Sequence, residues 1–253
     1  MPIKDSETDM DAISARVNRT VHENDSMLHG PLDQAHIQSY LRIGNSALRA
    51  MRAAMAAAGS DAPRAILDFG CGWGRVARWL QAAFPDAAIE GCDIDANGTG
   101  FVAETFGIPT WQAPIVPEEI RPGRQYDLVW AGSVLTHISA EHAERLLARL
   151  FSLLRPRGLL VVTTHGRLIE QWVADGAFEQ DPERDLYLGA ARDCRAVGYG
   201  YRDYPGCDGL GVSVTRPQWL FDWAFKDRER RVVSYIERGW NDHQDVFAVE
   251  RRA

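Results

Sequence analysis

The sequence predicts an α/β fold in which helices cover both faces of a mainly parallel β-sheet. Between residues 65 and 164, short apolar segments that suit buried strands alternate with segments of helical periodicity. The first strand runs into a turn with glycine at positions 70, 72 and 74, and a helical pattern follows from residue 75. Near the other end, segments 231–238 and 245–250 have the pattern of two strands joined by a short turn.

Composition limits the partners and the compartment. The 253 residues are 45% hydrophobic, which is enough for one sizeable core with or without an inserted subdomain. A net charge of −7 argues against a grip on nucleic acid through its phosphates. The four cysteines have no metal-ligand spacing, and we find neither a signal-peptide pattern nor an apolar run of the ~18 residues that span a membrane. We therefore expect a cytoplasmic protein with reduced thiols, no metal, and no nucleic-acid or membrane partner.

The N-terminal part is predicted to extend the main domain. Residues 1–24 are polar with little periodicity, and we expect a flexible tail or a loose lid. Residues 36–58 carry the apolar stripe of a helix, which ends at Gly59. This helix either covers a ligand or only seals one end of the sheet. The predicted division is a tail and covering helix over 1–58 and a main domain over 59–253.

The glycine turn is the first candidate site. A glycine turn at the carboxyl end of a parallel strand, leading into a helix, is where open α/β sheets bind nucleotide-like ligands. The second predicted strand, residues 87–94, carries Asp93 near its end, about twenty residues past the turn. A carboxylate there presents two acceptor oxygens to the vicinal hydroxyls of a ribose. The alternative role for Asp93 is the N-cap of the following helix.

The spacing of the glycines distinguishes between ligands. The dinucleotide pattern G-x-G-x-x-G is absent, and D-x-G-x-G-x-G over residues 68–74 instead resembles motif I of the class I S-adenosylmethionine-dependent methyltransferases. The resemblance implies a Rossmann-like, doubly wound, seven-stranded sheet with an antiparallel last strand, an N-terminal helical extension and an insertion after strand five. It also implies that the turn wraps the methionine part of the cofactor and that its acid orients the loop or meets the amino group. The residues concerned are Asp68, Gly70, Cys71, Gly72, Trp73 and Gly74.

The same resemblance implies further cofactor contacts. Ile94 would pack on the adenine. After the third predicted strand, 109–113, many relatives carry an aspartate for the adenine amino group, whereas this chain has alanine and proline. That contact is therefore expected from backbone groups or from Gln112. The fourth predicted strand, 126–131, resembles the one whose end lies under the sulfonium, and its residues there are Ala131, Gly132 and Ser133.

The second half of the chain contains the expected acceptor site. A helix capped by Ser139 is predicted to stop at the turn 155–158 and to lead into a fifth strand, 159–164. Residues 167–215 lack regular alternation, so we expect a long loop with one helical piece at 168–173. We interpret it as an acceptor-binding cap; a structural insertion and an oligomer contact are the alternatives. Its candidate contacts are Tyr199, Tyr201 and Tyr204, and Thr215 is predicted to cap the helix that follows.

Methyl transfer from a sulfonium requires little more than positioning of the acceptor. The electrophile is already activated, so a base is needed only if the acceptor keeps a proton, as a hydroxyl does. His137 and His165 both follow strands at the expected cofactor edge, and an imidazole near neutral pKa suits proton removal. Either histidine has a structural alternative, namely hydrogen bonding to backbone at a helix entry or simply lining the pocket.

The predicted function is S-adenosylmethionine-dependent methylation of a small molecule or sugar by a monomer or homodimer. The tail 239–247 is similar to the ends of methyltransferases that accompany glycosyltransferases in bacterial glycan gene sets, which favours a hydroxyl acceptor. A nucleotide-cofactor oxidoreductase would need the absent dinucleotide spacing. A nucleic-acid methyltransferase would need a basic face and an Asn-Pro-Pro-Tyr-like motif, where this chain has Ala-Gly-Ser-Val. A protein that binds the cofactor without transfer remains open.

Overall fold

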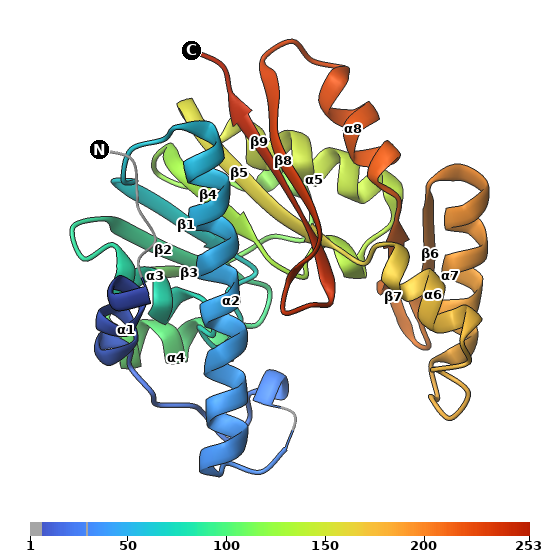
Figure 1. The fold of residues 1–253 in the computed structure, drawn as a ribbon, viewed down its shortest axis with the longest axis horizontal. Helices are drawn as coiled ribbons and strands as arrows, with labels where there is room; N and C mark the ends of the chain where they lie inside the picture. The colour runs from blue at the N-terminus through green and yellow to red at the C-terminus, as the bar shows by residue number, and fades with distance from the viewer. Residues whose placement is uncertain (1–6, 29) are drawn as a thin grey trace. The chain divides into compact units, whose positions relative to one another are not determined.

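The computed structural model describes residues 7–28 and 30–253, and its central feature is a seven-stranded sheet (Figure 1). The strand order is β3-β2-β1-β4-β5-β9-β8, and β9 runs antiparallel to β5 and β8. The strands are β1 (Ala65–Phe69), β2 (Ala88–Asp93), β3 (Thr110–Gln112), β4 (Tyr126–Ala131), β5 (Leu154–Thr164), β8 (Arg230–Trp240) and β9 (Gln244–Arg251). This topology confirms the predicted fold class, including the antiparallel last strand.

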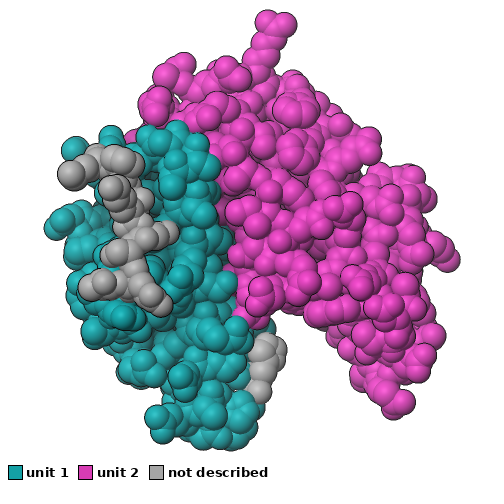
Figure 2. Space-filling model, viewed as in Figure 1, with its two compact units in different colours: residues 1–130 teal, residues 131–253 magenta. Residues whose placement is uncertain are grey.

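The chain divides into two compact units, residues 1–130 and 131–253 (Figure 2). In the first, β1 lies between β2 and β4, and all five of its residues are buried. Its main helices are α1 (Glu7–Arg16), α2 (Gln34–Ala58), α3 (Ala77–Ala83) and α4 (Ala96–Phe106). The long α2 begins at the Asp33 cap, whose side chain accepts the His36 N–H, and ends at Gly59 in the left-handed conformation. The predicted 36–58 helix is therefore confirmed.

The N-terminal segment differs from the flexible tail or loose lid that we expected. In its described part, α1 packs against α3 and buries Met10 and Ile13. Beyond α1, the carbonyls of Asn18 and Thr20 accept hydrogen bonds from the Arg78 guanidinium at 3.2 and 2.7 Å. The apolar positions 10, 13, 17 and 21 recur at helical spacing, a pattern too sparse to stand out in a polar sequence. The rest of the predicted tail, residues 1–6, lies outside the described residues.

In the second unit, the junction between α5 (Ala140–Ser152) and β5 is earlier than predicted. The Ser139 side chain caps α5 by accepting the His142 N–H, as expected. However, the helix ends at Ser152, and residues 155–158 belong to β5 rather than to a turn that stops the helix. Pro156 is tolerated there because the pairing with β9 begins only at Leu159.

Residues 167–215 form regular structure, so the prediction of a long loop was wrong. They contain α6 (Arg167–Ala174), α7 (Arg184–Val197) and a hairpin of β6 (Tyr199–Tyr204) and β7 (Cys207–Thr215). In Figure 1 the two helices lie beside this hairpin, around a small core of their own. Gly200 allows the approach, because a Cβ there would overlap the Ala190 carbonyl. Gly200, one of the glycines that suggested a loop, is therefore what lets the α7 backbone pack closely on β6.

The helix after β7 begins differently from the prediction. Thr215 is the last residue of β7 and not a helix cap, because Arg216 takes the cap position of α8 (Pro217–Phe225), which has Pro217 at its start. Within the described part of the chain, no helix combines the length and the apolar character needed to cross a bilayer.

Candidate functional site

The glycine turn after β1 is held by the neighbouring strand. The backbone N–H groups of Gly70 and Cys71 both donate to the Cys92 carbonyl, at 2.8 and 3.0 Å. All three glycines have positive φ, of 76° at Gly70, 49° at Gly72 and 78° at Gly74. A side chain would strain each of these conformations, which explains the alternating glycines. The turn lasts until α3 begins at Ala77, two residues later than the sequence pattern indicated.

The glycines have different surroundings. A Cβ on Gly74 would come within 2.6 Å of the Phe106 ring, so this glycine is required for packing within the protein. A Cβ on Gly72 would meet no atom within 4 Å. The space over Gly72 is therefore open to a ligand that approaches the backbone closely.

Asp93 at the end of β2 supports this turn directly. One of its carboxylate oxygens accepts the Gly72 N–H at 2.7 Å, and the other accepts the Asp95 N–H at 2.9 Å. The N-cap role that was the alternative for Asp93 belongs to Asp95, whose side chain accepts the Asn97 N–H at the start of α4. Each oxygen of Asp93 keeps a second acceptor site, which suits it to a pair of hydroxyl donors.

Asp68 is fully buried in β1. Burial raises its pKa to about 7, and the negative charge of nearby Asp93 adds to the shift. Its Oδ2 atom is buried without a hydrogen-bond partner in the described structure. Burial likewise raises the pKa of the Cys71 thiol well above its ordinary value, so this cysteine is a neutral part of the turn.

Three more predicted residues surround the turn. Trp73 stacks on His22 of the N-terminal segment, with ring centroids 4.4 Å apart, and contacts Phe101 of α4. Ile94, directly after β2, is 48% exposed, so its side chain is accessible to a ligand. Gln112 is exposed and donates from Nε2 to the Ile94 carbonyl at 3.1 Å. The first unit thus brings the predicted glycine turn, ribose acid and adenine residues together.

In the second unit, the segment after β4 is held in a strained conformation. Ala131 is buried, and Ser133 has φ of 62°, in the left-handed region that non-glycine residues rarely adopt. The Ser133 N–H donates to Thr163 Oγ1 at 2.7 Å, and its hydroxyl contacts Gln244 Nε2 at 2.9 Å. The short helix η3 (Leu135–His137) follows immediately.

The Nδ1 atom of His137 lies within hydrogen-bond distance of two groups, the Gly211 carbonyl and the Tyr204 hydroxyl. Nδ1 lies 3.0 Å from the Gly211 carbonyl, which can only accept, so Nδ1 carries the proton. The lone pair is therefore on Nε2, the atom that would receive a proton in base catalysis. Burial lowers the pKa of His137, and its bond to Gly211 opposes the shift. His137 is therefore neutral near pH 7, with its unprotonated nitrogen, Nε2, able to accept a proton.

His165 has the same tautomer in a different environment. Its Nδ1 lies 3.1 Å from the Ser213 carbonyl, so Nε2 again carries the lone pair. Complete burial, together with the neighbouring His243 and His137, lowers its pKa to about 3. A group with so low a pKa accepts protons poorly at neutral pH, so the environment favours His137 over His165 as the base.

Comparison with known proteins shows the family. A model of the methyltransferase domain matches residues 38–235. The chain belongs to this family.

Curated relatives include a trans-aconitate 2-methyltransferase of Methylobacterium radiotolerans, 32% identical over 132 residues, which are 52% of this chain and 49% of that protein. A malonyl-[acyl-carrier protein] O-methyltransferase of Halalkalibacterium halodurans is 31% identical over 42% of this chain and 41% of its own length. The chain thus spans about half the length of the curated relatives it matches.

Solved structures support the fold. An amino pentose methyltransferase of Micromonospora echinaspora, determined with bound S-adenosylmethionine, has a TM-score of 0.57 at 16% identity, over 88% of this chain and 99% of that one. A magnesium protoporphyrin IX methyltransferase of Synechocystis with bound S-adenosylhomocysteine has a TM-score of 0.56 at 16% identity, over 88% of this chain and 91% of that one.

The residues around the glycine turn, in the first unit of this methyltransferase domain, are chemically suited to S-adenosylmethionine, the cofactor of the family. The open space over Gly72, the two acceptor oxygens of Asp93 and the exposed Ile94 match a backbone approach, a ribose diol and an adenine ring. The unpaired oxygen of Asp68 is an acceptor for an ammonium group or for a donor of the loop.

The three candidate tyrosines of the methyltransferase domain have different positions. Tyr204 lies beside the candidate base, with its hydroxyl 3.2 Å from His137 Nδ1. Tyr199 is buried and donates its hydroxyl to the Ile138 carbonyl at 2.8 Å, which anchors the β6–β7 hairpin. Tyr201 donates to Asp203 at 2.7 Å. The structure therefore brings only Tyr204 into contact with a candidate catalytic residue.

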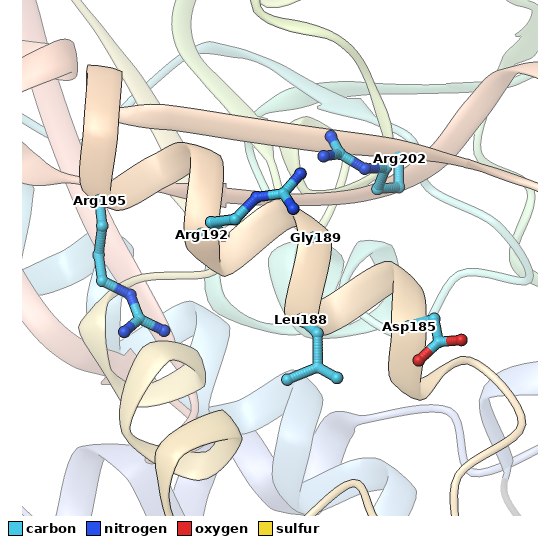
Figure 3. Close-up of a pocket in the computed structure, with 6 residues that line it drawn as sticks. All are labelled: Asp185, Leu188, Gly189, Arg192, Arg195 and Arg202. Carbon is cyan, nitrogen blue, oxygen red and sulfur yellow. The ribbon is translucent and has the colours of Figure 1, made fainter.

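A pocket of about 600 Å³ lies on the α7–β6 part of the methyltransferase domain (Figure 3). In Figure 3 Arg192 and Arg202 lie on one side of α7, and Arg195 points away from them. Asp193 pairs with Arg202 at 2.7 Å and with Arg192 at 3.2 Å, and these bonds lower the pKa of its carboxyl group. None of the predicted site residues lines this pocket, so it is distinct from the surroundings of His137.

Sequence reasoning missed several residues around the candidate base. Gln244 and Thr163 contact Ser133, while His243 stacks on Trp172 and lies near His165. The resemblance of the 239–247 tail to other methyltransferases was a signal for His243 and Gln244, but it carried no information about their contacts. Among the described residues, no group of three or more His, Cys, Asp or Glu side chains is arranged to hold a metal ion.

Proposed function

We propose that the chain is an S-adenosylmethionine-dependent methyltransferase that acts on a hydroxyl group of a small molecule, with a sugar as the preferred class. The observation that carries the proposal is the contact of His137 Nδ1 with the Gly211 carbonyl, which leaves Nε2 as a proton acceptor. A hydroxyl needs such a base because it is protonated at neutral pH. The similarity of the tail to methyltransferases of glycan gene sets supports the sugar class.

Cofactor binding in this proposal depends on the residues predicted from the sequence. Asp93 accepts the ribose hydroxyls, Ile94 packs on the adenine, and Gln112 or nearby backbone serves the adenine amino group. The turn holds the methionine part with Asp68, Gly70, Cys71, Gly72, Trp73 and Gly74, and the end of β4 contributes Ala131, Gly132 and Ser133. When bound, the cofactor supplies a methyl group on a sulfonium, an electrophile that needs no further activation.

The protein's own part in the reaction is to position the acceptor and to take its proton. The acceptor O–H proton would pass to His137 Nε2 as the oxygen bonds to the methyl carbon and the carbon–sulfur bond breaks, with S-adenosylhomocysteine as the leaving group. Tyr204 remains a proposed acceptor contact; its hydroxyl lies 3.2 Å from Nδ1 of the imidazole, whereas the proton is taken by Nε2. Residues 167–215 remain our proposal for the acceptor-binding cap, because β7 supplies the Gly211 carbonyl and β6 supplies Tyr204.

A carboxylate acceptor is the second candidate, and the names of two curated relatives favour it. Trans-aconitate and the malonyl group both carry carboxylates. A carboxylate is already ionised at neutral pH and needs no base, so His137 would then be dispensable for proton transfer.

Release of S-adenosylhomocysteine tests the proposal. The purified chain is incubated with S-adenosylmethionine and a panel of sugars, phenols, short-chain alcohols and di- and tricarboxylic acids. Release that depends on a hydroxyl compound supports the proposal, and release with the acids alone supports the carboxylate candidate. Binding of S-adenosylmethionine without release by any compound would favour a cofactor-binding protein that performs no transfer.

A further inference from the structure

The start of β9 is joined to the segment after β4 by a closed ring of hydrogen bonds. The Ser133 N–H donates to Thr163 Oγ1 at 2.7 Å, Thr163 Oγ1 donates to Gln244 Oε1 at 2.5 Å, and Gln244 Nε2 donates to Ser133 Oγ at 2.9 Å. Thr163 and Gln244 are buried, so these bonds are shielded from water. Buried polar groups that are fully satisfied in this way fix a single local conformation.

The direction of every bond in the ring is determined. Thr136 Oγ1 donates to the Ser133 carbonyl at 2.6 Å, so in its 3.1 Å contact with Ser133 Oγ it can only accept. The Ser133 hydroxyl therefore donates to Thr136 and accepts from Gln244 Nε2. With the Gln244 amide reversed, no hydrogen would remain for the Ser133–Thr136 contact. The ring is consistent with one orientation of Gln244 only.

The ring holds Ser133 in a conformation that it would otherwise leave. A non-glycine residue at φ of 62° is disfavoured, and such strain persists only where surrounding contacts enforce it. His137 completes the segment, and its N–H donates to the Val134 carbonyl. A change at Ser133 would therefore be transmitted directly to η3 and to the imidazole.

We propose that Gln244 is a positioning residue for His137, which it holds by fixing Ser133 and Thr163 and thereby the segment 132–137. The inference rests on the proposed role of His137 as the base. The inference also explains a role for the tail 239–247, which resembles other methyltransferases: β9 begins at Gln244, and this side chain closes the ring. Gln244 itself has no contact with the imidazole in the described structure.

The test is NMR of the His137 ring in the ligand-free full chain, with His137→Asn used for assignment. Wild type is expected to show protonated Nδ1 and a pKa below 6.5. Gln244→Ala should give a mixture of tautomers, a pKa closer to 6.5, and at least tenfold faster hydrogen exchange in residues 131–137. Thr163→Val, which keeps the buried shape, should do the same and replaces Gln244→Ala if that variant does not fold. Asp242→Asn, exposed in the same turn, is the matched control and should match wild type.

Ser133→Gly provides the second arm, because glycine adopts positive φ without restraint. In a Ser133→Gly background, Gln244→Ala should change the His137 tautomer and pKa at most slightly. Unchanged His137 signals in folded Gln244→Ala and Thr163→Val would overturn the inference, and so would an equally large effect of Gln244→Ala in the Ser133→Gly background. These readouts need no acceptor, so failure of the proposed function, seen as absent methyl transfer by wild type, is recognised separately.

Discussion

The Asp93 carboxylate accepts the backbone N–H of Gly72 at 2.7 Å, and so joins the end of one strand to the turn that follows its neighbour. The sequence separates these residues by twenty-one positions, but parallel pairing of β1 with β2 brings them together. One oxygen therefore shapes the turn, while the carboxylate keeps acceptor sites that suit the proposed ribose contact. Our proposal thus gives Asp93 two tasks, to shape the turn and to bind the sugar.

Replacing Asp93 should weaken cofactor binding more than it weakens the fold. In Asp93→Ala, calorimetric affinity for S-adenosylhomocysteine should fall by about 2–5 kcal/mol, because two hydrogen bonds to a charged acceptor are lost. Asp95→Ala is the matched control. It removes the cap of α4 and should lower the free energy of unfolding by about 1 kcal/mol, with affinity within a few fold of wild type. Wild-type affinity in a folded Asp93→Ala protein would contradict the assignment.

Asp68 should make the stability of the protein depend on pH. Its pKa is raised to about 7 in the folded state, against the ordinary value of 3.8. Between these values the folded protein retains a proton that the unfolded chain has lost, so the free energy of unfolding falls as the pH rises through this window. Asp68→Asn does not ionise, and its stability relative to wild type should increase by about 2–3 kcal/mol from pH 5 to pH 8.

Denaturant unfolding at four pH values between 5 and 8 measures this difference. Parallel curves for wild type and Asp68→Asn would show that Asp68 is ionised in the fold throughout. If Asp68 also meets the cofactor's amino group, the stabilised variant should bind S-adenosylhomocysteine more weakly than wild type.

The two histidines should respond differently to the same substitution. Asparagine keeps an N–H that can donate to the Gly211 or Ser213 carbonyl, but it has no lone pair in place of Nε2. With a hydroxyl acceptor, His137→Asn should lower kcat by roughly 10²–10⁴. His165→Asn should lower it less than tenfold, because a pKa of about 3 already makes His165 a poor base. Equal losses in both variants would refute the choice of His137.

The pH dependence of the rate gives an independent check on His137. Activity requires the neutral imidazole, and burial lowers the pKa of His137 below 6.5. The rate should therefore be constant from pH 7 to 8 and decline only on acidification below 6.5. A carboxylate acceptor would give a profile without this acidic limb between pH 5 and 7, and His137→Asn would then retain activity.

The sequence was sufficient to predict those elements and site residues that have a local sequence signal. The bounds 126–131 of the fourth strand and the end of α2 at Ala58 agree with the structure, because continuous apolar runs and a helix stop at glycine are local signals. The turn, Asp93 and the closing strands were likewise predicted. The signal for each of these lies in residues close together in the sequence, although the contact of Asp93 with Gly72 itself depends on the pairing of β1 with β2.

The sequence was insufficient where packing or long-range contacts decide. Gly200 and Gly211 suggested a loop, but each permits close approach of a neighbouring backbone in the α7–hairpin unit. Choosing between His137 and His165 required their burial and their carbonyl partners on β7. Gln244 lies 111 positions from Ser133, so no local pattern could have linked them.

The claim that the cofactor occupies the space over Gly72 is tested most directly by calorimetry of S-adenosylhomocysteine binding to wild type, Gly72→Ala and Gly107→Ala. Both glycines have positive φ, 49° and 65°, and a Cβ on either meets no atom within 4 Å. The two variants should therefore lose similar stability, about 1 kcal/mol each. If the space over Gly72 holds the cofactor, Gly72→Ala should bind at least tenfold more weakly than wild type, with Gly107→Ala unchanged. Equal affinity in all three proteins, or no binding by wild type, would contradict the account.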